Sequence, residues 1–241
     1  MLNPVTIKTS RTVSSIVPTT NKKLLRKNVK NRLKIISQRE LIKQSDVILN
    51  KLKPILLEQQ TQKGASLGIG CYMNMDASEV KTLNIINFLF ENGFTVYLPK
   101  CTSTKESGQI NLRTPQLDIH HPHLTFHQMV SFQHVLDLKP SGKFKLKEPS
   151  DESAGAHPPN DIDVLLVPGV AFNLHNMARL GHGCGYYDDY IYRHAHYNNK
   201  RPLLLIGLAL KEQIIEQDIP LEEHDRKLDC IIVGDGTVNW K

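Results

Sequence analysis

Cysteines are few in this sequence, and long apolar runs are missing. The four cysteines lie far apart, none belongs to a C-x-x-C pair, and nothing else points to an oxidising compartment. We therefore expect reduced thiols, and neither a disulfide framework nor a zinc site. No stretch approaches the roughly 20 apolar residues that a membrane-spanning helix requires, so we expect no membrane partner. A chain of 241 residues suffices for one domain with a sizeable core.

Acidic residues are missing from the first 39 positions, and Glu40 is the first of them. Residues 1–20 carry hydroxyls, two prolines and two basic residues, a composition shared by flexible extensions and mitochondrial presequences. We favour a flexible N-terminal extension over 1–20, because Pro4 and Pro18 leave little room for an amphipathic helix. The expected compartment is either the cytoplasm or the mitochondrion. Residues 21–241 are then expected to form a single domain.

Positive charge gathers directly after this extension and accounts for much of the net charge of +6. The basic residues of this segment are Lys22, Lys23, Arg26, Lys27, Lys30, Arg32 and Lys34. Such a segment can attract nucleic acid, but it lacks the interleaved aromatic side chains of a single-strand platform, so we expect no nucleic-acid partner. Lys22 and Arg26 lie four positions apart and share one helix face. That face is either simply solvated or part of a binding site.

Glycine is concentrated in the loop 181–185, between an apolar run and a predicted helix. Glycines at alternate positions permit positive φ and leave several amide N–H groups open to one anion. A helix that begins near Tyr186 adds its positive dipole end, and Arg179 adds a fixed charge. Asp188 is a candidate Mg²⁺ ligand beside a phosphate or, with equal weight, a charge in the first turn of the helix.

A longer pattern surrounds this loop. It reads P-G-x-x-F from Pro168 to Phe172 and R-L-G-x-G-x-G-Y-Y-D from Arg179 to Asp188. Residues 219–225 and 228–232 follow with the patterns P-x-E-x-H-D and x-D-x-I-I. In this order the segments resemble the 5-formyltetrahydrofolate cyclo-ligase family. The resemblance implies ATP- and Mg²⁺-dependent conversion of 5-formyltetrahydrofolate to 5,10-methenyltetrahydrofolate, with release of ADP and phosphate. The formyl oxygen would be phosphorylated and N10 would close the ring.

The resemblance also implies roles for individual side chains. ATP, the co-substrate, would be held by Lys22, Lys23, Arg26, Arg179, Leu180, Gly181, His182, Gly183, Cys184, Gly185, Tyr186 and Tyr187. Of these, Lys22, Arg26 and Arg179 are the candidate catalytic residues, because they would neutralise phosphate charge. The candidate Mg²⁺ ligands are Asp188 and Asp225. The folate, with or without a polyglutamate tail, would contact Met73, Glu79, Phe144, His182, Gly183, Cys184, Gly185 and Tyr186. We expect a monomer.

Several of these residues have plainer explanations. Asp225 is either a metal ligand or a loop acid paired with Arg226 or Lys227. Glu79 is a folate contact, a charge at a helix N-terminus, or both. Either tyrosine after the glycine loop could be a core residue instead.

Two positions depart from the family's pattern. Several relatives have Arg or Lys within the glycine loop, where this chain has His182 and Cys184. A catalytically weakened relative that binds or regulates folate is therefore the second hypothesis.

Apolar spacing predicts alternating helices and strands. Two helices are expected between 21 and 57, broken near Ser37, where Ser37-x-x-Glu40 reads as a capping box. The further expected elements are a strand over 67–73, a helix over 79–91, and strands over 94–98, 203–210 and 230–233, with a short helix over 211–217. This order indicates an α/β domain. The resemblance implies a three-layer α/β/α fold with a mostly parallel sheet, like that of NagB- and CoA-transferase-like enzymes.

The segment between 102 and 160 is harder to interpret. Short strands are expected over 110–113, 124–129 and 144–146, and a mobile surface loop over 150–160. Histidines 120, 121, 123 and 127 suggest a metal site, but Pro122 interrupts them and no Cys or carboxylate stands at a familiar spacing. We expect most of these histidines to lie in a surface loop.

Overall fold

The computed structural model describes residues 21–75, 78–109, 121–141, 146–150, 158–199, 201–222 and 225–241. In chain order the elements are α1 (Lys22–Leu33), α2 (Gln38–Lys63), β1 (Gly68–Gly70), α3 (Leu83–Glu91), β2 (Thr95–Ser103), α4 (Thr104–Ser107), β3 (Pro122–Met129), α5 (Phe132–Asp137), β4 (Pro140–Ser141), β5 (Leu146–Lys147), β6 (Ile162–Val167), β7 (Ala171–Asn173), β8 (Ala178–Leu180), α6 (Tyr186–Tyr197), β9 (Leu204–Ala209), the 3₁₀ helix η2 (Lys211–Gln213), β10 (Cys230–Val233) and β11 (Val238–Trp240). The N-terminal extension, the strand expected over 110–113, most of the strand expected over 144–146 and most of the loop expected over 150–160 lie outside the described residues.

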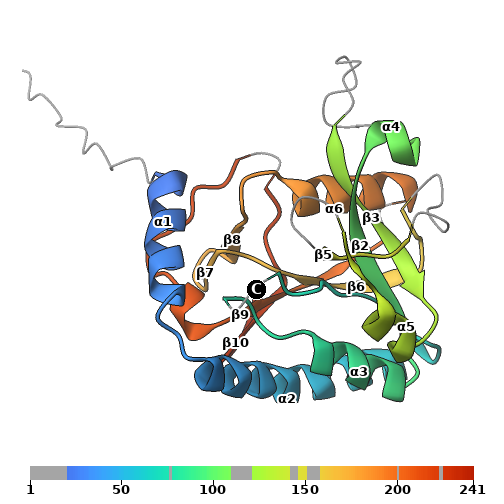
Figure 1. Ribbon diagram of the computed structural model, residues 1–241, viewed down its shortest axis with the longest axis horizontal. Helices are drawn as coiled ribbons and strands as arrows, with labels where there is room; N and C mark the ends of the chain where they lie inside the picture. The colour runs from blue at the N-terminus through green and yellow to red at the C-terminus, as the bar shows by residue number, and fades with distance from the viewer. Residues whose placement is uncertain are drawn as a thin grey trace, which may run out of the picture.

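A seven-stranded sheet forms the centre of the molecule, in the order β11-β10-β9-β6-β1-β2-β3 (Figure 1). The five inner strands are mutually parallel. The two edge strands, β11 and β3, each run antiparallel to their neighbour. The sheet is therefore mixed but mostly parallel, as expected.

Helices cover both faces of this sheet, so the domain has three layers (Figure 1). Alternate residues of β6 show the division, because successive side chains of a strand point to opposite faces. Val164 and Leu166 pack in the core beneath α2 and α3, whereas Leu165 and Val167 pack beneath α6. Burial on both faces explains why the inner strands read as nearly continuous apolar runs.

The first two helices confirm the predicted break. Ser37 caps α2, and its side chain accepts a hydrogen bond from the Glu40 amide at 3.2 Å. Helix α2 continues to Lys63, six residues beyond the expected end, and stops at Gly64 with φ 66°. Pro54 lies inside α2, so it does not end the helix.

Other boundaries differ from the prediction. Helix α3 begins at Leu83 rather than at residue 79, so Glu79 lies in the preceding loop and the helix N-terminal role considered for it is wrong. Strand β1 is only three residues long. Strand β2 continues to Ser103 because β3 pairs with it over eight positions, a partner that local sequence does not reveal. The helix expected over 211–217 is a single turn, η2.

Two of the histidines assigned to a surface loop are core residues, so that prediction is wrong for them. His123 and His127 lie in β3 and are 3% and 1% exposed. Their Nε2 atoms lie 2.7 Å from the Ser107 hydroxyl and 2.8 Å from the Thr125 hydroxyl. Within the described ranges, no group of three or more His, Cys, Asp or Glu residues is placed to hold a metal ion.

The cysteines are free thiols. Cys71 and Cys230 are buried, Cys101 is partly buried and Cys184 is exposed. In the part of the chain that the structure describes, no helix has the length and apolar character needed to cross a membrane.

Candidate functional site

A cavity of about 410 Å³ lies beyond the carboxyl ends of the parallel strands. Its walls come from α1, the loops after β1 and β6, strands β2 and β3, the loop after β8 and the first turn of α6. In open α/β sheets this is the edge at which ligands bind. The wall has a cationic half and an apolar half.

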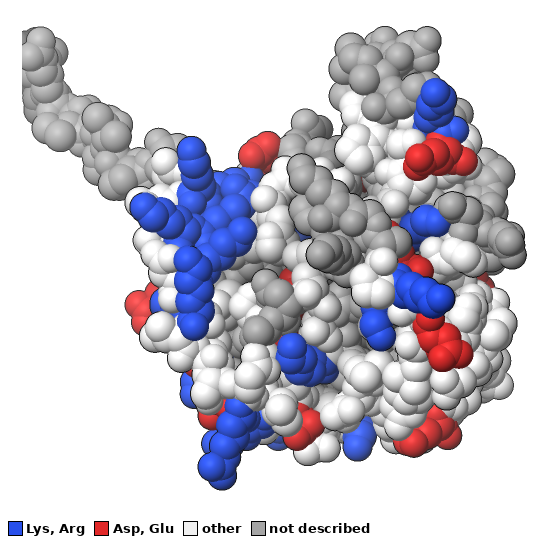
Figure 2. All heavy atoms as spheres, viewed as in Figure 1, with Lys and Arg blue, Asp and Glu red and all other residues white. Residues whose placement is uncertain are grey.

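Helix α1 contributes part of the cationic half. Lys22 and Arg26 both line the cavity, which confirms that they share one face of the helix. Arg26 Nε donates a hydrogen bond to the Gly181 carbonyl oxygen at 2.7 Å. Lys23 is exposed and is not brought to the cavity wall. Figure 2 shows basic side chains gathered on the surface over α1.

Lys22 connects α1 to a distant segment. Its Nζ lies 2.8 Å from Glu222 Oε1 and 3.0 Å from Asp225 Oδ2. Burial disfavours the charged amine, but the hydrogen bonds to Glu222 and Asp225 outweigh this effect and raise the pKa of Lys22. Lys22 is therefore a permanent cation at the cavity. Asp225 pairs with a helix about 200 residues away, a partner that its sequence neighbourhood did not suggest.

The glycine loop follows the hairpin of β7 and β8. In that hairpin Phe172 pairs with Arg179, so the two parts of the sequence signature are joined by strand pairing. Gly183 has φ 116° and Gly185 has φ 67°, conformations that residues with a Cβ rarely adopt. Gly185 is the N-cap of α6, which confirms the predicted helix start. The loop therefore presents backbone amides beside a helix N-terminus, an arrangement suited to phosphate.

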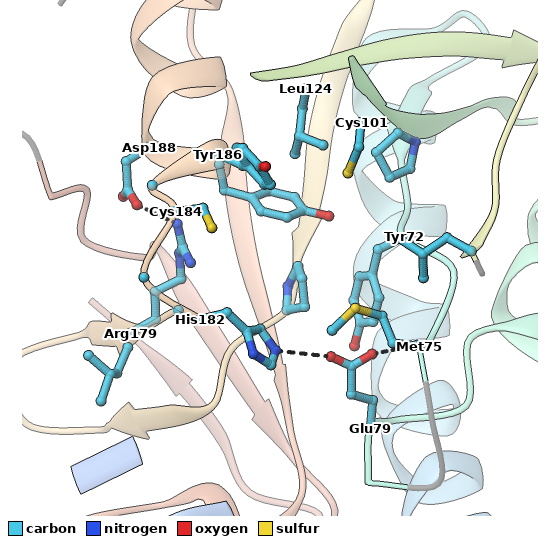
Figure 3. A pocket seen from close by; sticks show the side chains of 18 of the residues that line it. Tyr72, Met75, Glu79, Cys101, Leu124, Arg179, His182, Cys184, Tyr186 and Asp188 are labelled. Atoms are coloured by element: carbon cyan, nitrogen blue, oxygen red, sulfur yellow. Dashed lines mark hydrogen bonds and ion pairs between the residues drawn. The ribbon is translucent and has the colours of Figure 1, made fainter. Parts of the chain in front are cut away.

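Arg179 points toward the first turn of α6 (Figure 3). Its Nη2 lies 2.7 Å from Asp188 Oδ2, and its guanidinium lies 5.5 Å from the centre of the Tyr187 ring. Asp188 Oδ1 also accepts from the Arg226 amide at 3.2 Å. The side chain of Arg179 is 5% exposed, and its buried Nε has no hydrogen-bond partner among the described residues. A buried donor without a partner costs free energy, so this site is suited to an acceptor from a ligand.

The apolar half lies opposite, formed by Tyr72, Met73, Met75, Pro99, Leu124 and Leu146. Glu79 lies at its edge, where its Oε2 accepts a hydrogen bond from the Met75 amide at 2.8 Å. Its Oε1 faces His182 Nε2 at 3.7 Å across the cavity (Figure 3). Burial, with the nearby charge of Glu79, raises the pKa of the Tyr72 phenol well above its usual value. Tyr72 is therefore a neutral wall for a ring-shaped ligand.

Most of the expected site residues meet in this cavity. The exceptions are Lys23, which lies outside, and Phe144, which is outside the described residues. Sequence reasoning assigned no role to Cys101, Glu148 or Glu222, all of which line the cavity. Glu222 belonged to the P-x-E-x-H-D segment, so the signal was present. Only the structure shows that it faces Lys22.

Fold and site together define an α/β protein whose cavity has a cationic half, suited to an anion, beside an apolar half. The model of the 5-formyltetrahydrofolate cyclo-ligase family matches residues 18–234. The 5-formyltetrahydrofolate cyclo-ligase of Saccharomyces cerevisiae is 41% identical over 219 residues, which cover 91% of this chain and 98% of the yeast protein. The mouse 5-formyltetrahydrofolate cyclo-ligase is 28% identical over 225 residues, covering 92% and 98%. The chain belongs to the 5-formyltetrahydrofolate cyclo-ligase family and is an enzyme of that class.

Solved structures agree with this fold. The 5,10-methenyltetrahydrofolate synthetase of Aquifex aeolicus superposes with a TM-score of 0.64 at 24% identity, covering 91% of this chain and 92% of the other. The Mycoplasma pneumoniae 5,10-methenyltetrahydrofolate synthetase gives a TM-score of 0.58 at 23% identity, covering 88% and 98%. The three-layer α/β/α architecture is therefore shared with these synthetases.

Proposed function

We propose that this protein converts 5-formyltetrahydrofolate to 5,10-methenyltetrahydrofolate, using ATP and Mg²⁺ and releasing ADP and phosphate. The observation that carries the proposal is the division of one cavity into a cationic glycine loop and an apolar half with a carboxylate. This pairing suits a reaction in which a polyphosphate must meet a pterin.

The cationic half is suited to the triphosphate. Lys22, Arg26 and Arg179 reach it from two separate elements, and the amides of the glycine loop and α6 add further donors. Phosphoryl transfer depends mainly on positioning and on neutralising charge, so cations and N–H groups are the machinery that it needs.

The apolar half is suited to the folate. Methionine and tyrosine side chains offer surfaces for a flat ring, and Glu79 offers a carboxylate oxygen to the pterin's N–H groups. Tyr186 and Cys184 lie between the two halves (Figure 3), where the formyl group and the γ-phosphate would meet.

The reaction then proceeds in two steps. The formyl oxygen attacks the γ-phosphorus, so that a new P–O bond forms and the bond to ADP breaks. N10 next attacks the activated carbon, the C–O bond breaks with release of phosphate, and the N10 proton is lost. Lys22, Arg26 and Arg179 would hold the transferring phosphoryl group in line and offset its charge. The product carries the methenyl bridge between N5 and N10.

Mg²⁺ fits the residues that are present. Asp188 and Asp225 both line the cavity, and protein sites commonly hold Mg²⁺ with one or two carboxylates plus substrate phosphates. Each carboxylate is paired with a cation, Asp188 with Arg179 and Asp225 with Lys22. Bound Mg²⁺ would neutralise phosphate charge.

A second cavity, of about 370 Å³, supports a polyglutamylated substrate. Glu148 lines both cavities, so the second adjoins the first. Lys100, Lys139 and His134 line it and would favour the carboxylates of a glutamate tail, whereas Glu148 and Asp137 would limit that attraction. We further propose a monomer in the cytoplasm or mitochondrion, without nucleic-acid or membrane partners.

The test mixes purified protein with 5-formyltetrahydrofolate, ATP and Mg²⁺ and follows the near-ultraviolet absorbance of the methenyl product. We expect growth of this band only when ATP and the metal are both present. Folate binding without product would favour the weakened relative, and the absence of both would overturn the proposed function.

A further inference from the structure

His182 extends from the glycine loop toward the folate half of the cavity. Its Nε2 lies 3.7 Å from Glu79 Oε1, so the contact links the loop after β8 with the loop after β1 (Figure 3). The other oxygen of Glu79 is occupied by the Met75 amide. The oxygen that faces His182 is therefore the one left for a substrate N–H group.

The two sides of this contact differ in freedom. The loop backbone is held because Arg26 Nε donates to the carbonyl of Gly181, next to His182. The carboxylate of Glu79 is also held and is only 11% exposed. The imidazole, in contrast, is 45% exposed. It can rotate without moving the backbone, and an exposed side chain reorients quickly.

We propose that His182 is a positioning residue that couples nucleotide binding to folate binding. Without nucleotide, the imidazole faces Glu79 and competes with the substrate for its carboxylate oxygen. Phosphates in the glycine loop attract the imidazole N–H, so the ring turns from Glu79 toward the nucleotide. Glu79 Oε1 then becomes available to the folate. This inference rests on the proposed function, because it assigns the two halves to nucleotide and folate.

The charges in the cavity support this exchange. A triphosphate in the loop carries several negative charges, whereas Glu79 carries one, so the nucleotide is the stronger partner for an imidazole N–H. Arg26 and Lys22 line the same half and hold the phosphates there. An ion pair as exposed as the present contact contributes at most about a fivefold effect. The coupling between the two ligands should have a similar size.

The experiment measures the affinity for 5-formyltetrahydrofolate by titration calorimetry, with and without a saturating non-hydrolysable ATP analogue and Mg²⁺. In the wild type, the analogue should tighten folate binding about three- to fivefold. In His182→Ala, folate alone should bind as tightly as it does to the wild type with analogue, and the analogue should add nothing. A side chain that merely supports the fold would weaken binding when removed, not strengthen it.

Two further variants define the origin of the effect. Glu79→Gln should also abolish the coupling, but with weaker folate binding in both states. His175→Ala is the matched control, because His175 is 84% exposed on the connection between β7 and β8 and faces Asp218 instead of the cavity. It should keep the wild-type coupling. Thermal unfolding of each variant verifies that it is folded.

The outcomes separate the two proposals. Coupling that persists in His182→Ala, or folate binding that is weaker in both states, overturns the role of His182 alone. Binding of both ligands to the wild type without coupling has the same consequence. A wild type that binds neither ligand overturns the proposed function as well.

Discussion

Replacing Arg26 by Ala should weaken the use of ATP far more than the binding of folate. Arg26 lines the cationic half of the cavity, and its Nε holds the Gly181 carbonyl at 2.7 Å. Its guanidinium also lies beside Gly183, about where a phosphate in the loop would be contacted. The variant therefore loses both a phosphate ligand and a restraint on the loop. Within the described residues, the side-chain hydrogen bond of Arg26 goes to the glycine loop and not to the apolar half.

The size of the effect follows from the kind of contact. A hydrogen bond from a charged group contributes about 1.5–3 kcal/mol, which corresponds to roughly 10- to 150-fold. The value of kcat/KM for ATP should fall by this factor, and the dissociation constant for 5-formyltetrahydrofolate should change less than about twofold. The kcat/KM of Arg26→Lys for ATP should lie between those of the wild type and Arg26→Ala, because lysine keeps the charge but loses the hydrogen-bond geometry of Nε.

Initial rates of methenyl formation at varied ATP give kcat and KM, and calorimetry gives folate affinity. Lys27→Ala is the matched control, since Lys27 is an exposed cation on the same helix and does not line the cavity. An unchanged KM for ATP in Arg26→Ala would refute the assigned role. So would an equal loss in Lys27→Ala, because general attraction by the basic helix would then explain the effect.

Three other predictions concern stability and reactivity. Arg193→Met should lower the free energy of unfolding by about 3–5 kcal/mol, as measured by urea denaturation. Arg193 is fully buried, and its removal leaves the buried carboxylate of Asp189, 2.8 Å away, unpaired. A decrease of less than about 1 kcal/mol would contradict this reasoning. Burial, reinforced by the Arg193 cation, lowers the pKa of His123 from 6.5 to about 4, so protonation favours the unfolded chain. This contribution to the free energy of unfolding should be fully present above pH 6.5 and should be lost as the pH falls toward 4. In His123→Gln, the urea concentration at the unfolding midpoint should depend less on pH over the same range. Iodoacetamide should label the exposed Cys184 first, and ATP should protect it, as peptide mass mapping can show. Burial raises the pKa of the Cys71 thiol to about 12 and keeps Cys71 unreactive. Labelling of Cys184 that ATP does not slow would argue against a nucleotide at the glycine loop.

Sequence alone predicted the elements whose signals are local. Ser37 marked the start of α2 because a capping hydroxyl accepts a hydrogen bond from an amide only three residues further along, here that of Glu40. The glycine loop and the start of α6 were equally readable, since positive φ and helix capping are properties of neighbouring residues. The shared face of Lys22 and Arg26 followed from helical periodicity.

Features that depend on distant partners could not be predicted. Strand β2 exceeded its apolar run because β3 supplies hydrogen bonds along its whole length. His123 looked like a surface residue until β3 placed it opposite Ser107 and beneath α6. The start of α3 was misplaced because Glu79 has the chemistry of a first-turn residue, yet its carboxylate binds the Met75 amide in the loop.

The ion pair between Lys22 and Glu222 has a consequence for biosynthesis. The cavity needs the first helix and a segment 200 positions later, so it cannot be complete while the chain is still emerging from the ribosome. A nascent chain that already contains the glycine loop would lack Glu222 and Asp225, the partners of Lys22. Under the proposed function, nucleotide would therefore not assist early folding and would stabilise only a chain that has been synthesised beyond Asp225.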